Sequence, residues 1–222
     1  SRSDLRPRRD VIKHILKIGL PIALQDGFIQ ISFLAITVIA NGRGLVDAAA
    51  VGIVEKFIGL VFIVPSTMLS TVSAISAQNI GAAKMPRAKQ TMRSAMLITS
   101  VYGLVMATAL QFIPQLAVGL FTSDPQVLAQ GSDYLRGYVW DCIFAGVHFC
   151  FSGFFTACGY ALISFLHNSI SITCARVPLA WLSSLLYPDT LYPMGLSTCI
   201  GSVVSCLICV GAYWWLKRKG KI

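Results

Sequence analysis

The stretch that decides the fold is Pro65-Ser-Thr-Met-Leu-Ser-Thr-Val-Ser-Ala-Ile-Ser-Ala-Gln-Asn-Ile-Gly-Ala-Ala-Lys-Met-Pro-Arg-Ala-Lys89. Its first half is apolar and rich in small residues, which is typical of the end of a membrane helix. Its second half breaks at Asn79 and then gathers Lys84, Arg87 and Lys89 in a short loop. Because Lys and Arg resist translocation, a basic loop between two apolar segments stays on the cytoplasmic side. This placement fixes the expected orientation of every other segment.

The composition indicates a membrane protein. The chain has 222 residues, of which 55% are hydrophobic and only 12% charged, and its mean hydropathy is +0.71. A soluble domain usually carries about twice that share of charge. The formal net charge of +9 comes mainly from three basic clusters at alternate junctions of the apolar segments: Arg2, Arg6, Arg8, Arg9, Lys13 and Lys17; Lys84, Arg87, Lys89 and Arg93; Lys217, Arg218, Lys219 and Lys221. Such a distribution follows membrane topology and argues against a nucleic-acid partner.

The apolar segments predict six transmembrane helices. The expected spans are residues 11–40, 47–77, 88–112, 126–156, 160–186 and 194–216. Each covers the roughly 20 residues that a bilayer core requires, and backbone groups in lipid must be hydrogen-bonded within such a segment, which leaves only helices. We expect a cytoplasmic basic linker (1–13), a six-helix transmembrane lobe (14–216) and a cytoplasmic basic tail (217–222), with both termini cytoplasmic.

Two sequence patterns bear on helix shape and packing. Pro21, Pro65 and Pro178 lie inside predicted helices, where each removes a backbone hydrogen bond and permits a bend. Small residues recur at four-residue spacing on the third and sixth predicted helices, which lets neighbouring helices approach closely. These residues are Ala95, Thr99, Gly103 and Ala107 on the third helix, and Ser197, Gly201, Ser205 and Cys209 on the sixth.

Three motifs together resemble the MATE (multidrug and toxic compound extrusion) transporters. They are Lys17-Ile-Gly-Leu-Pro-Ile-Ala-Leu-Gln25, Gln78-Asn-Ile-Gly-Ala-Ala-Lys84, and Leu120-Phe-Thr-Ser-Asp124 followed ten residues later by Tyr134-Leu-Arg136. The segment Arg176-Val-Pro-Leu-Ala180 is similar to the family's penultimate helix. The likeness covers nearly the whole chain and corresponds to the second of the family's two six-helix lobes.

The resemblance implies a fold class and a function. It implies an all-α membrane lobe that belongs with an N-terminal six-helix lobe missing from this chain. It further implies an antiporter of the inner membrane that exports amphipathic, often cationic small molecules. The export would be driven by Na⁺ or H⁺, with no cofactor besides this coupling ion. No enzyme is implied, and the sequence has no combination of motifs that would indicate catalysis.

Three ionisable residues are expected near the middle of the membrane. Asp26, Asp141 and Arg176 each lie about 14 or 15 residues into a predicted span, roughly 20 Å deep at the rise of a helix. Charges at this depth are costly and mark functional sites. Either an Asp–Arg pair satisfies itself there, or a carboxylate exchanges a proton or a sodium ion. Because an arginine favours the ionised form of a nearby carboxylate, the Asp farther from Arg176 would be the better proton carrier.

Arg176 and five further polar residues are candidates for the substrate cavity. Gln25 and Gln30 flank the first carboxylate and could coordinate a cation or bind substrate. Glu55 either faces the cavity or has a structural role. His148 lies seven residues after the second carboxylate, on the same helical face, where it either relays protons or packs with hydrogen bonds. Asn168 is expected to join helices by hydrogen bonding.

Two alternatives to the antiporter remain open. One is a flippase for a lipid-linked oligosaccharide, built on similar helices but usually with a more cationic cavity. The mid-membrane balance of two acids against one base favours cationic substrates instead. The other is a non-transporting membrane scaffold, in which neutral variants of Asp26 and Asp141 would have no effect.

Overall fold

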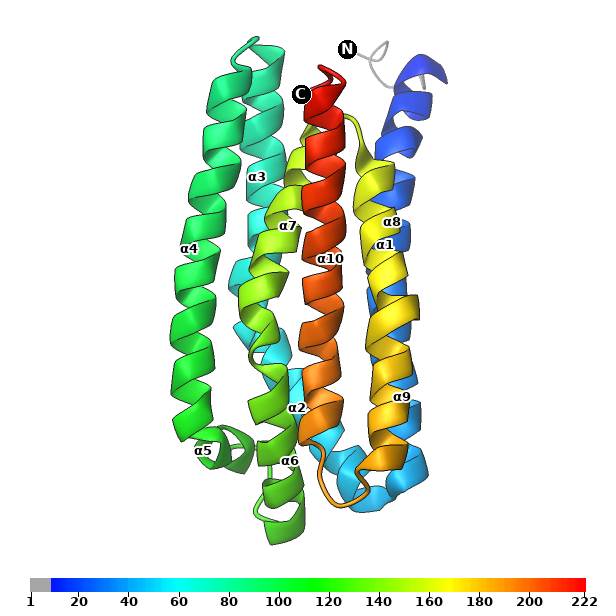
Figure 1. Cartoon of the computed structure of the whole chain (residues 1–222), viewed down its shortest axis with the longest axis vertical. Coiled ribbons are helices and arrows are strands. Elements are labelled where there is room, and N and C mark those ends of the chain that lie inside the picture. Colours follow the sequence, from blue (N-terminus) through cyan, green and yellow to red (C-terminus); the bar gives the residue numbers. More distant parts are fainter. Residues whose placement is uncertain (1–8) are drawn as a thin grey trace, which may run out of the picture.

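The computed structural model describes residues 9–222, and this part of the chain is helical throughout, apart from short connections. The elements, in chain order, are α1 (Arg9–Arg43), α2 (Leu45–Val61), α3 (Ile63–Gly81), α4 (Met85–Phe112), α5 (Pro114–Gly119), α6 (Pro125–Tyr138), α7 (Asp141–Ala157), α8 (Ala161–Ser171), η2 (Ile172–Arg176), α9 (Val177–Leu186) and α10 (Tyr192–Arg218). The long helices run side by side as a bundle (Figure 1). The predicted all-α fold class is confirmed. The predicted linker at residues 1–13 falls mostly outside the described residues.

The described part of the chain has four single helices long and apolar enough to cross a membrane, and the predicted six spans are reached if each of two bent helix pairs is one span. Single helices long and apolar enough to cross a membrane are α1, α4, the continuous run of α8, η2 and α9, and α10. The other two spans are bent pairs: α2 with α3, at 43°, and α6 with α7, at 44°. The short helix α5, which begins with a proline, was not predicted.

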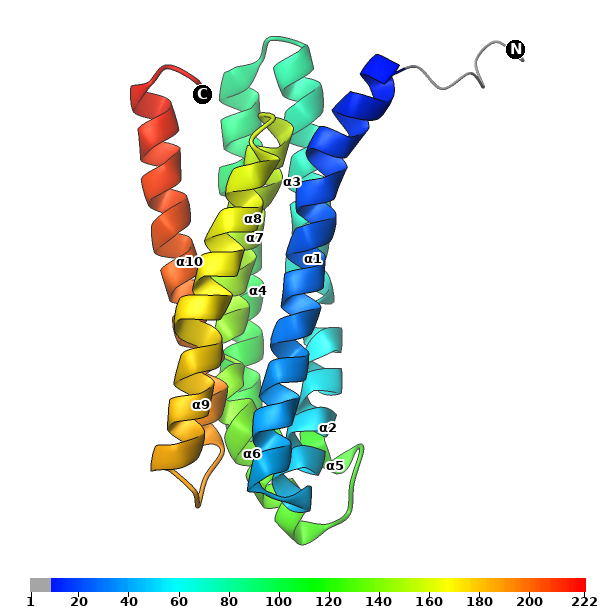
Figure 2. The ribbon, with the colours of Figure 1, turned by 90° about the vertical axis from the view of Figure 1, so that its right-hand side faces the viewer.

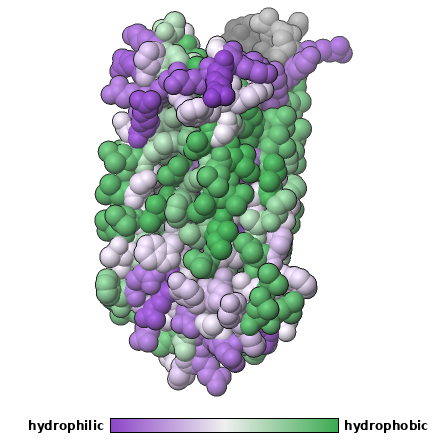
Figure 3. All heavy atoms as spheres, in the orientation of Figure 1, coloured by the Kyte–Doolittle hydropathy of each residue, from purple (hydrophilic) through white to green (hydrophobic). Residues whose placement is uncertain are grey.

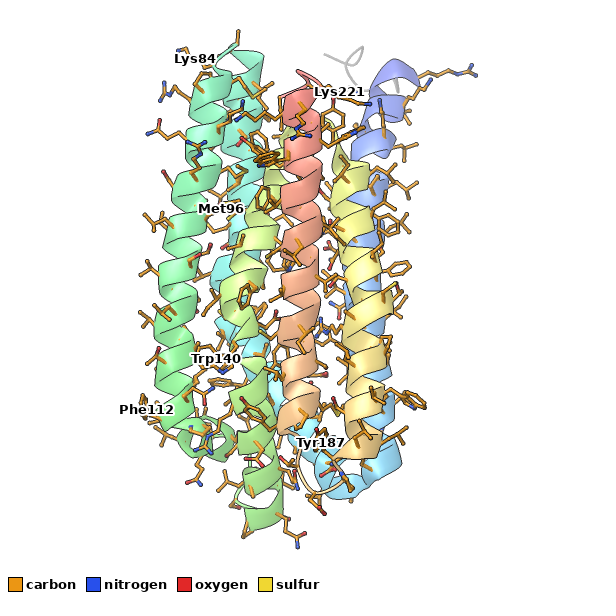
Figure 4. The ribbon with its side chains drawn as sticks, viewed as in Figure 1. Lys84, Met96, Phe112, Trp140, Tyr187 and Lys221 are labelled. Atoms are coloured by element: carbon orange, nitrogen blue, oxygen red, sulfur yellow. The ribbon has the colours of Figure 1, made fainter. Side chains whose placement is uncertain are left out.

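The two ends of the bundle differ in charge. The start of α1, the α3–α4 loop and the end of α10 lie at one end, together with the α7–α8 turn (Figures 1 and 2). Lys84 and Lys221 mark this end, and Phe112 and Tyr187 mark the opposite one (Figure 4). Between the ends, the visible face is a continuous hydrophobic belt (Figure 3). The described members of the three basic clusters therefore lie at one end of the lobe, which we call the basic end. We call the opposite end the acidic end, since the turns there carry Asp47, Asp124 and Asp189.

The bend between α2 and α3 follows from Pro65. Proline has no N–H, so the carbonyl four residues earlier, that of Val61, loses its helical partner. The Tyr102 hydroxyl on α4 donates to this carbonyl at 2.9 Å. The helix breaks between these two positions, at Phe62. The bend predicted from Pro65 is confirmed, and the neighbouring helix supplies the hydrogen bond that the proline removes.

The bend between α6 and α7 has no proline and was not predicted. At the end of α6, the Arg136 carbonyl accepts a hydrogen bond from Gln111 Nε2 of α4, at 2.8 Å. Just past the bend, α4 touches the backbone of α7 at Gly103, where an added Cβ would lie 2.8 Å from the Ile143 Cα atom. The small-residue stripe of α4 is buried, as expected from its spacing. Contacts with α4 therefore hold this bend.

The two remaining prolines have different outcomes. The helix α1 is assigned as one continuous element through Pro21. The fifth span contains the π-helical turn η2, which ends two residues before Pro178. Such turns are rare and occur frequently at functional sites. This one carries Arg176.

Arg43 holds together the connections at the acidic end. It ends α1, and its Nε lies 2.6 Å from Asp47 Oδ2. Its Nη atoms donate to four carbonyl oxygens at the end of α9 and in the following turn: Ser184 (3.0 Å), Tyr187 (3.0 Å), Pro188 (2.7 Å) and Thr190 (3.4 Å). The sequence analysis did not single out this residue.

Candidate functional site

A polar layer separates two hydrophobic cores. One core lies toward the acidic end and includes Val54, Leu135 and Met194. The other lies toward the basic end and includes Phe154 and Leu216. The helix α7 runs from one core to the other, and its buried side chains include an Asp and a His residue. Charged and polar groups thus gather at mid-height, where the sequence analysis expected them.

A small cavity of about 60 Å³ lies in this layer, between α1, α7, α8, η2 and α10. Its polar lining residues are Tyr138, Asp141, His148, Asn168, Ser171, Arg176, Thr198 and Ser202. Ile29, Phe33, Phe62 and Phe149 complete much of its wall. Three of the predicted candidates on α7 and α8, namely Asp141, His148 and Asn168, therefore meet Arg176 around one space.

Five polar atoms on this lining are buried and have no hydrogen-bond partner in the described part of the chain. They are Asp141 Oδ1, His148 Nδ1, Asn168 Nδ2, Arg176 Nε and Thr198 Oγ1. Buried polar groups are nearly always hydrogen-bonded, and a polar space of this size has room for a few waters or a small ion. The carboxylate, the hydroxyl and the imidazole of this set can hold a small cation or exchange a proton, whereas the Arg176 and Asn168 nitrogens can only donate hydrogen bonds.

Arg176 does not pair directly with Asp141. Its Nη2 donates to the Tyr138 hydroxyl at 3.0 Å, and its guanidinium lies over the Phe33 ring, 4.8 Å from the centroid. Within residues 9–222 it forms no ion pair with a carboxylate. The alternative of a self-satisfied Asp–Arg pair therefore does not fit the geometry. Arg176 and Asp141 nevertheless line the same cavity.

Glu55 is the second carboxylate near Arg176, in place of Asp26. The Thr37 hydroxyl on α1 donates to Glu55 Oε2 at 3.3 Å, while Oε1 is buried without a partner. The adjacent Lys56 is exposed. The two neighbouring charges on α2 therefore point to different surroundings, as residues about 100° apart on a helix should.

Asp26 belongs to a different space. It is exposed and lines an open cleft of about 490 Å³ between α1 and the α2–α3 pair. The cleft and the cavity share four wall residues, Ile29, Phe33, Phe62 and Phe149. Asp26 and Asp141 thus lie on opposite sides of one apolar wall, and only Asp141 is close to Arg176.

The two predicted glutamines lie outside the cavity. Gln25 is buried, at 2% exposure, and its Nε2 has no partner among the described residues. Gln30 is exposed. Neither lines the cavity or the cleft. Gln25 directly precedes Asp26 and points about 100° away from it on the helix, whereas Gln30, four residues on, lies on nearly the same face but borders neither space.

The sequence analysis missed His167, which is fully buried on α8. Its Nε2 lies 2.7 Å from Ser152 Oγ of α7, and its Nδ1 lies 2.6 Å from Ser205 Oγ of α10. His148 lies 3.4 Å, Nε2 to Oγ, from Ser202. The signal was present in the small-residue stripe of α10, since Ser205 is part of it.

These features define a multi-pass α-helical membrane protein with a polar site at mid-height. The chain belongs to the MatE family, whose family model matches residues 21–182. It is 22% identical over 221 residues to the "Probable multidrug resistance protein YoeA" of Bacillus subtilis, covering 100% of this chain and 48% of that protein. It is 29% identical over 140 residues to a protein named "FAD transporter" from Shewanella oneidensis, covering 62% and 30%.

Solved structures share this fold. A MATE protein crystallised in complex with MaL6 superimposes with a TM-score of 0.86 at 16% identity, over 99% of this chain and 49% of that chain. A MOP superfamily transporter from Pyrococcus furiosus, described as having a binding pocket of reverse polarity, gives a TM-score of 0.82 at 16% identity, over 93% and 45%. The chain spans about half the length of the relatives that it matches. It therefore has the fold of a single lobe of a two-lobe protein.

Proposed function

We propose that this chain is the second six-helix lobe of a secondary active exporter, which expels amphipathic cationic small molecules in exchange for Na⁺ or H⁺. The proposal includes a first six-helix lobe as partner, a location in the inner membrane and a cytoplasmic basic end with both termini. The observation that carries it is the set of unpaired buried polar atoms around Asp141, beside an open cleft that contains Asp26. The family relationship and the names of the relatives support transport as the activity.

The sizes of the two spaces suggest a division of roles. Ligand pockets for small molecules are typically about 300 to 1,000 Å³, a range that includes the cleft at about 490 Å³. The cavity, at about 60 Å³, accommodates an ion or a few waters but no drug. We therefore assign substrate to the cleft and the coupling ion to the cavity.

The shared wall offers a way to couple the two ligands. Phe33, Phe62 and Phe149 border both the cleft and the cavity. A flat cationic molecule in the cleft would contact these rings, which attract cations through their faces. Any displacement of the rings changes the shape of the cavity on the other side. Each ligand can thus alter the affinity for the other, as exchange of the two requires.

The charge balance favours cationic over anionic substrates. Asp26 is the ionisable residue on the cleft lining, and Asp141 and Glu55 outnumber Arg176 in the polar layer. A flippase for an anionic saccharide carrier would need the opposite balance. Asp26 is exposed on the cleft lining, so its carboxylate is accessible to a cation in the cleft.

Transport of ethidium, a cationic dye, tests the proposal. The chain is assembled with a first lobe, on one polypeptide or two, in proteoliposomes, and efflux is measured under an inward Na⁺ or H⁺ gradient. We expect Asp26→Asn and Asp141→Asn each to lower efflux at unchanged protein level. Asp189→Asn is the matched control, because Asp189 is exposed in an outer turn. Normal pumping by both variants would remove the carboxylate mechanism, whereas absence of efflux in the unmodified protein as well would favour the scaffold.

A further inference from the structure

We propose that the groove between α3 and α4, at the basic end of the lobe, binds an anionic phospholipid. The phosphate of this lipid lies beside the basic side chains at the start of α4, and one acyl chain follows the groove into the hydrophobic belt. The site is directed toward the bilayer, so it goes beyond the proposed exchange of a substrate for an ion. Its occupation does not depend on which molecule is transported.

The groove has a volume of about 450 Å³ and lies between two helices that are joined by the short loop at Lys84 (Figure 4). The helices are close together near this loop, where Ser76 Oγ of α3 lies 3.5 Å from the Ala88 carbonyl oxygen of α4. Farther from the loop, the floor of the groove consists of Val72 and Ala95, which are both buried. Because these two side chains are short, they leave the space between the helices unfilled.

The lining of the groove changes from polar to apolar along its length. Arg87 and Gln90 line the part near the loop, whereas Met68 and Ile98 line the part nearer the middle of the membrane. From Arg87 to Ile98, α4 rises about 16 Å, at 1.5 Å per residue. One leaflet of the hydrocarbon core is about 15 Å deep. The groove therefore matches, in length and in polarity, a phospholipid that stands in one leaflet.

A second hollow adjoins the groove at Gln90. It has a volume of about 460 Å³, and its other lining residues are Pro86, Lys89 and Arg93. A phosphate beside Gln90 therefore has Arg87 on one side and the two bases of the hollow on the other. Arginine can bind phosphate oxygens through two parallel hydrogen bonds. The Arg87 side chain is exposed, and no hydrogen bond of its guanidinium is found within residues 9–222, so its donors are available to a ligand.

The charge around the groove is of one sign. The chain has no Asp or Glu between Glu55 and Asp124, whereas four bases lie at the loop and the start of α4. Within the described residues, the ion pair of a basic side chain is that of Arg43 with Asp47, at the opposite end of the lobe. An anionic headgroup supplies the missing countercharge, and each base near an anionic membrane surface favours such binding.

The groove faces away from the cleft that we assign to substrate. On α3, Ser66 and Ser70 line the cleft, whereas Ile75 and Asn79 line the groove. At 3.6 residues per turn, these two pairs of positions lie on opposite sides of the helix. A first lobe that closes the cleft therefore leaves the groove open to lipid.

Basic residues at the ends of membrane helices also set the orientation of the chain. Orientation depends on the number of such charges and requires no groove beside them. Here the bases adjoin an apolar groove that extends about one leaflet deep, an arrangement that orientation alone does not explain.

Photo-cross-linking locates the lipid without any measurement of transport. The chain is assembled with a first lobe in phosphatidylcholine nanodiscs, which contain a trace of phosphatidylglycerol with a photoreactive acyl chain. Mass spectrometry then measures the label on the segments that contain Met68 and Ile98. We expect label on both segments, and less label from a photoreactive phosphatidylcholine of the same chain length.

Two pairs of variants test the two parts of the site. Arg87→Gln should lower the label about tenfold, the effect of losing one hydrogen bond to a charged group. Lys84→Gln is its matched control, because it removes the same charge from a side chain that lines neither space. Ser94→Phe fills the groove and should lower the label as well. Leu97→Phe, at an exposed position outside the groove, should leave the label unchanged.

Three results would overturn the site. One is equal label from phosphatidylglycerol and phosphatidylcholine, since binding would then ignore the charge of the headgroup. Another is equal label in Arg87→Gln and Lys84→Gln, with Ser94→Phe unchanged as well; size-exclusion chromatography checks that the variants fold. The third is absence of label from both segments, as expected if the first lobe or another protein covers the groove. Absence of ethidium efflux, measured separately, contradicts the exporter alone, because the cross-linking requires no transport.

Discussion

Asp26 and Asp141 lie at similar predicted depths, yet the structure gives them opposite surroundings. Asp26 faces an open cleft of about 490 Å³, whereas Asp141 is 3% exposed beside a cavity of about 60 Å³. Arg176 lines the cavity with Asp141 and is absent from the cleft lining that contains Asp26. An apolar wall that includes Phe62 separates the two. Depth in the membrane therefore does not define a site. The neighbouring helices decide whether a carboxylate contacts solvent, a ligand or an ion.

The largest expected effect comes from overpacking the tightly packed side of this comparison. The α6–α10 crossing, next to the Asp141 cavity, is so close at Gly137 that an added Cβ would overlap the Tyr192 carbonyl. We expect Gly137→Ala to lower the free energy of unfolding in detergent by about 3 kcal/mol, as overpacking does. At Gly27, next to Asp26, an added Cβ meets nothing within 4 Å. Gly27→Ala should therefore be neutral or slightly stabilising, and equal losses in both variants would contradict the packing difference.

The two carboxylates should also differ in what they bind. Equilibrium binding of ethidium to the assembled protein, measured by fluorescence, separates binding from pumping. We expect Asp26→Asn to raise the Kd about fivefold, since a solvated charge pair contributes about 1 kcal/mol. Asp141→Asn should leave the Kd unchanged while efflux is lost. The opposite pattern would place the substrate in the smaller cavity.

The smallest effect concerns the bend that places Phe62 between the two spaces. Tyr102→Phe removes the hydroxyl that donates to Val61 and should cost about 1 kcal/mol of unfolding free energy. Tyr213→Phe is the control, because no hydrogen bond of its hydroxyl is found within residues 9–222. A chemical-denaturation series in detergent gives both values. If the two variants were equally stable, the bend would not depend on the hydroxyl of Tyr102.

Several features of the fold could be read from the sequence because they depend on local properties. Hydropathy located the six spans, and the basic clusters predicted which ends of the helices lie together. Pro65 predicted a bend because it removes one defined hydrogen bond. The four-residue spacing of small residues identified the packed face of α4. Each of these signals acts within a few helical turns, so no knowledge of neighbouring helices was needed.

The features that were missed depend on partners far apart in the chain. The bend after Tyr138 is held by Gln111 and Gly103 of another helix. Arg43 donates hydrogen bonds to backbone carbonyl oxygens that lie 141 to 147 residues later in the chain. His167 gains its role from serines on two other helices. Gln111, Arg43 and His167 have no distinctive sequence signal by themselves, and Gly103 was recognised only as part of a packed face.

For the site, the sequence by itself determined which residues are costly in a membrane: Asp26, Glu55, Asp141 and Arg176 are charged and lie within apolar segments. Only the tertiary structure decided which groups surround each of these residues. It placed Arg176 on the cavity that Asp141 lines and put Asp26 across an apolar wall. The physical reason is that the cost of burying a charge depends on one side chain, whereas its compensation depends on the rotation and packing of several helices.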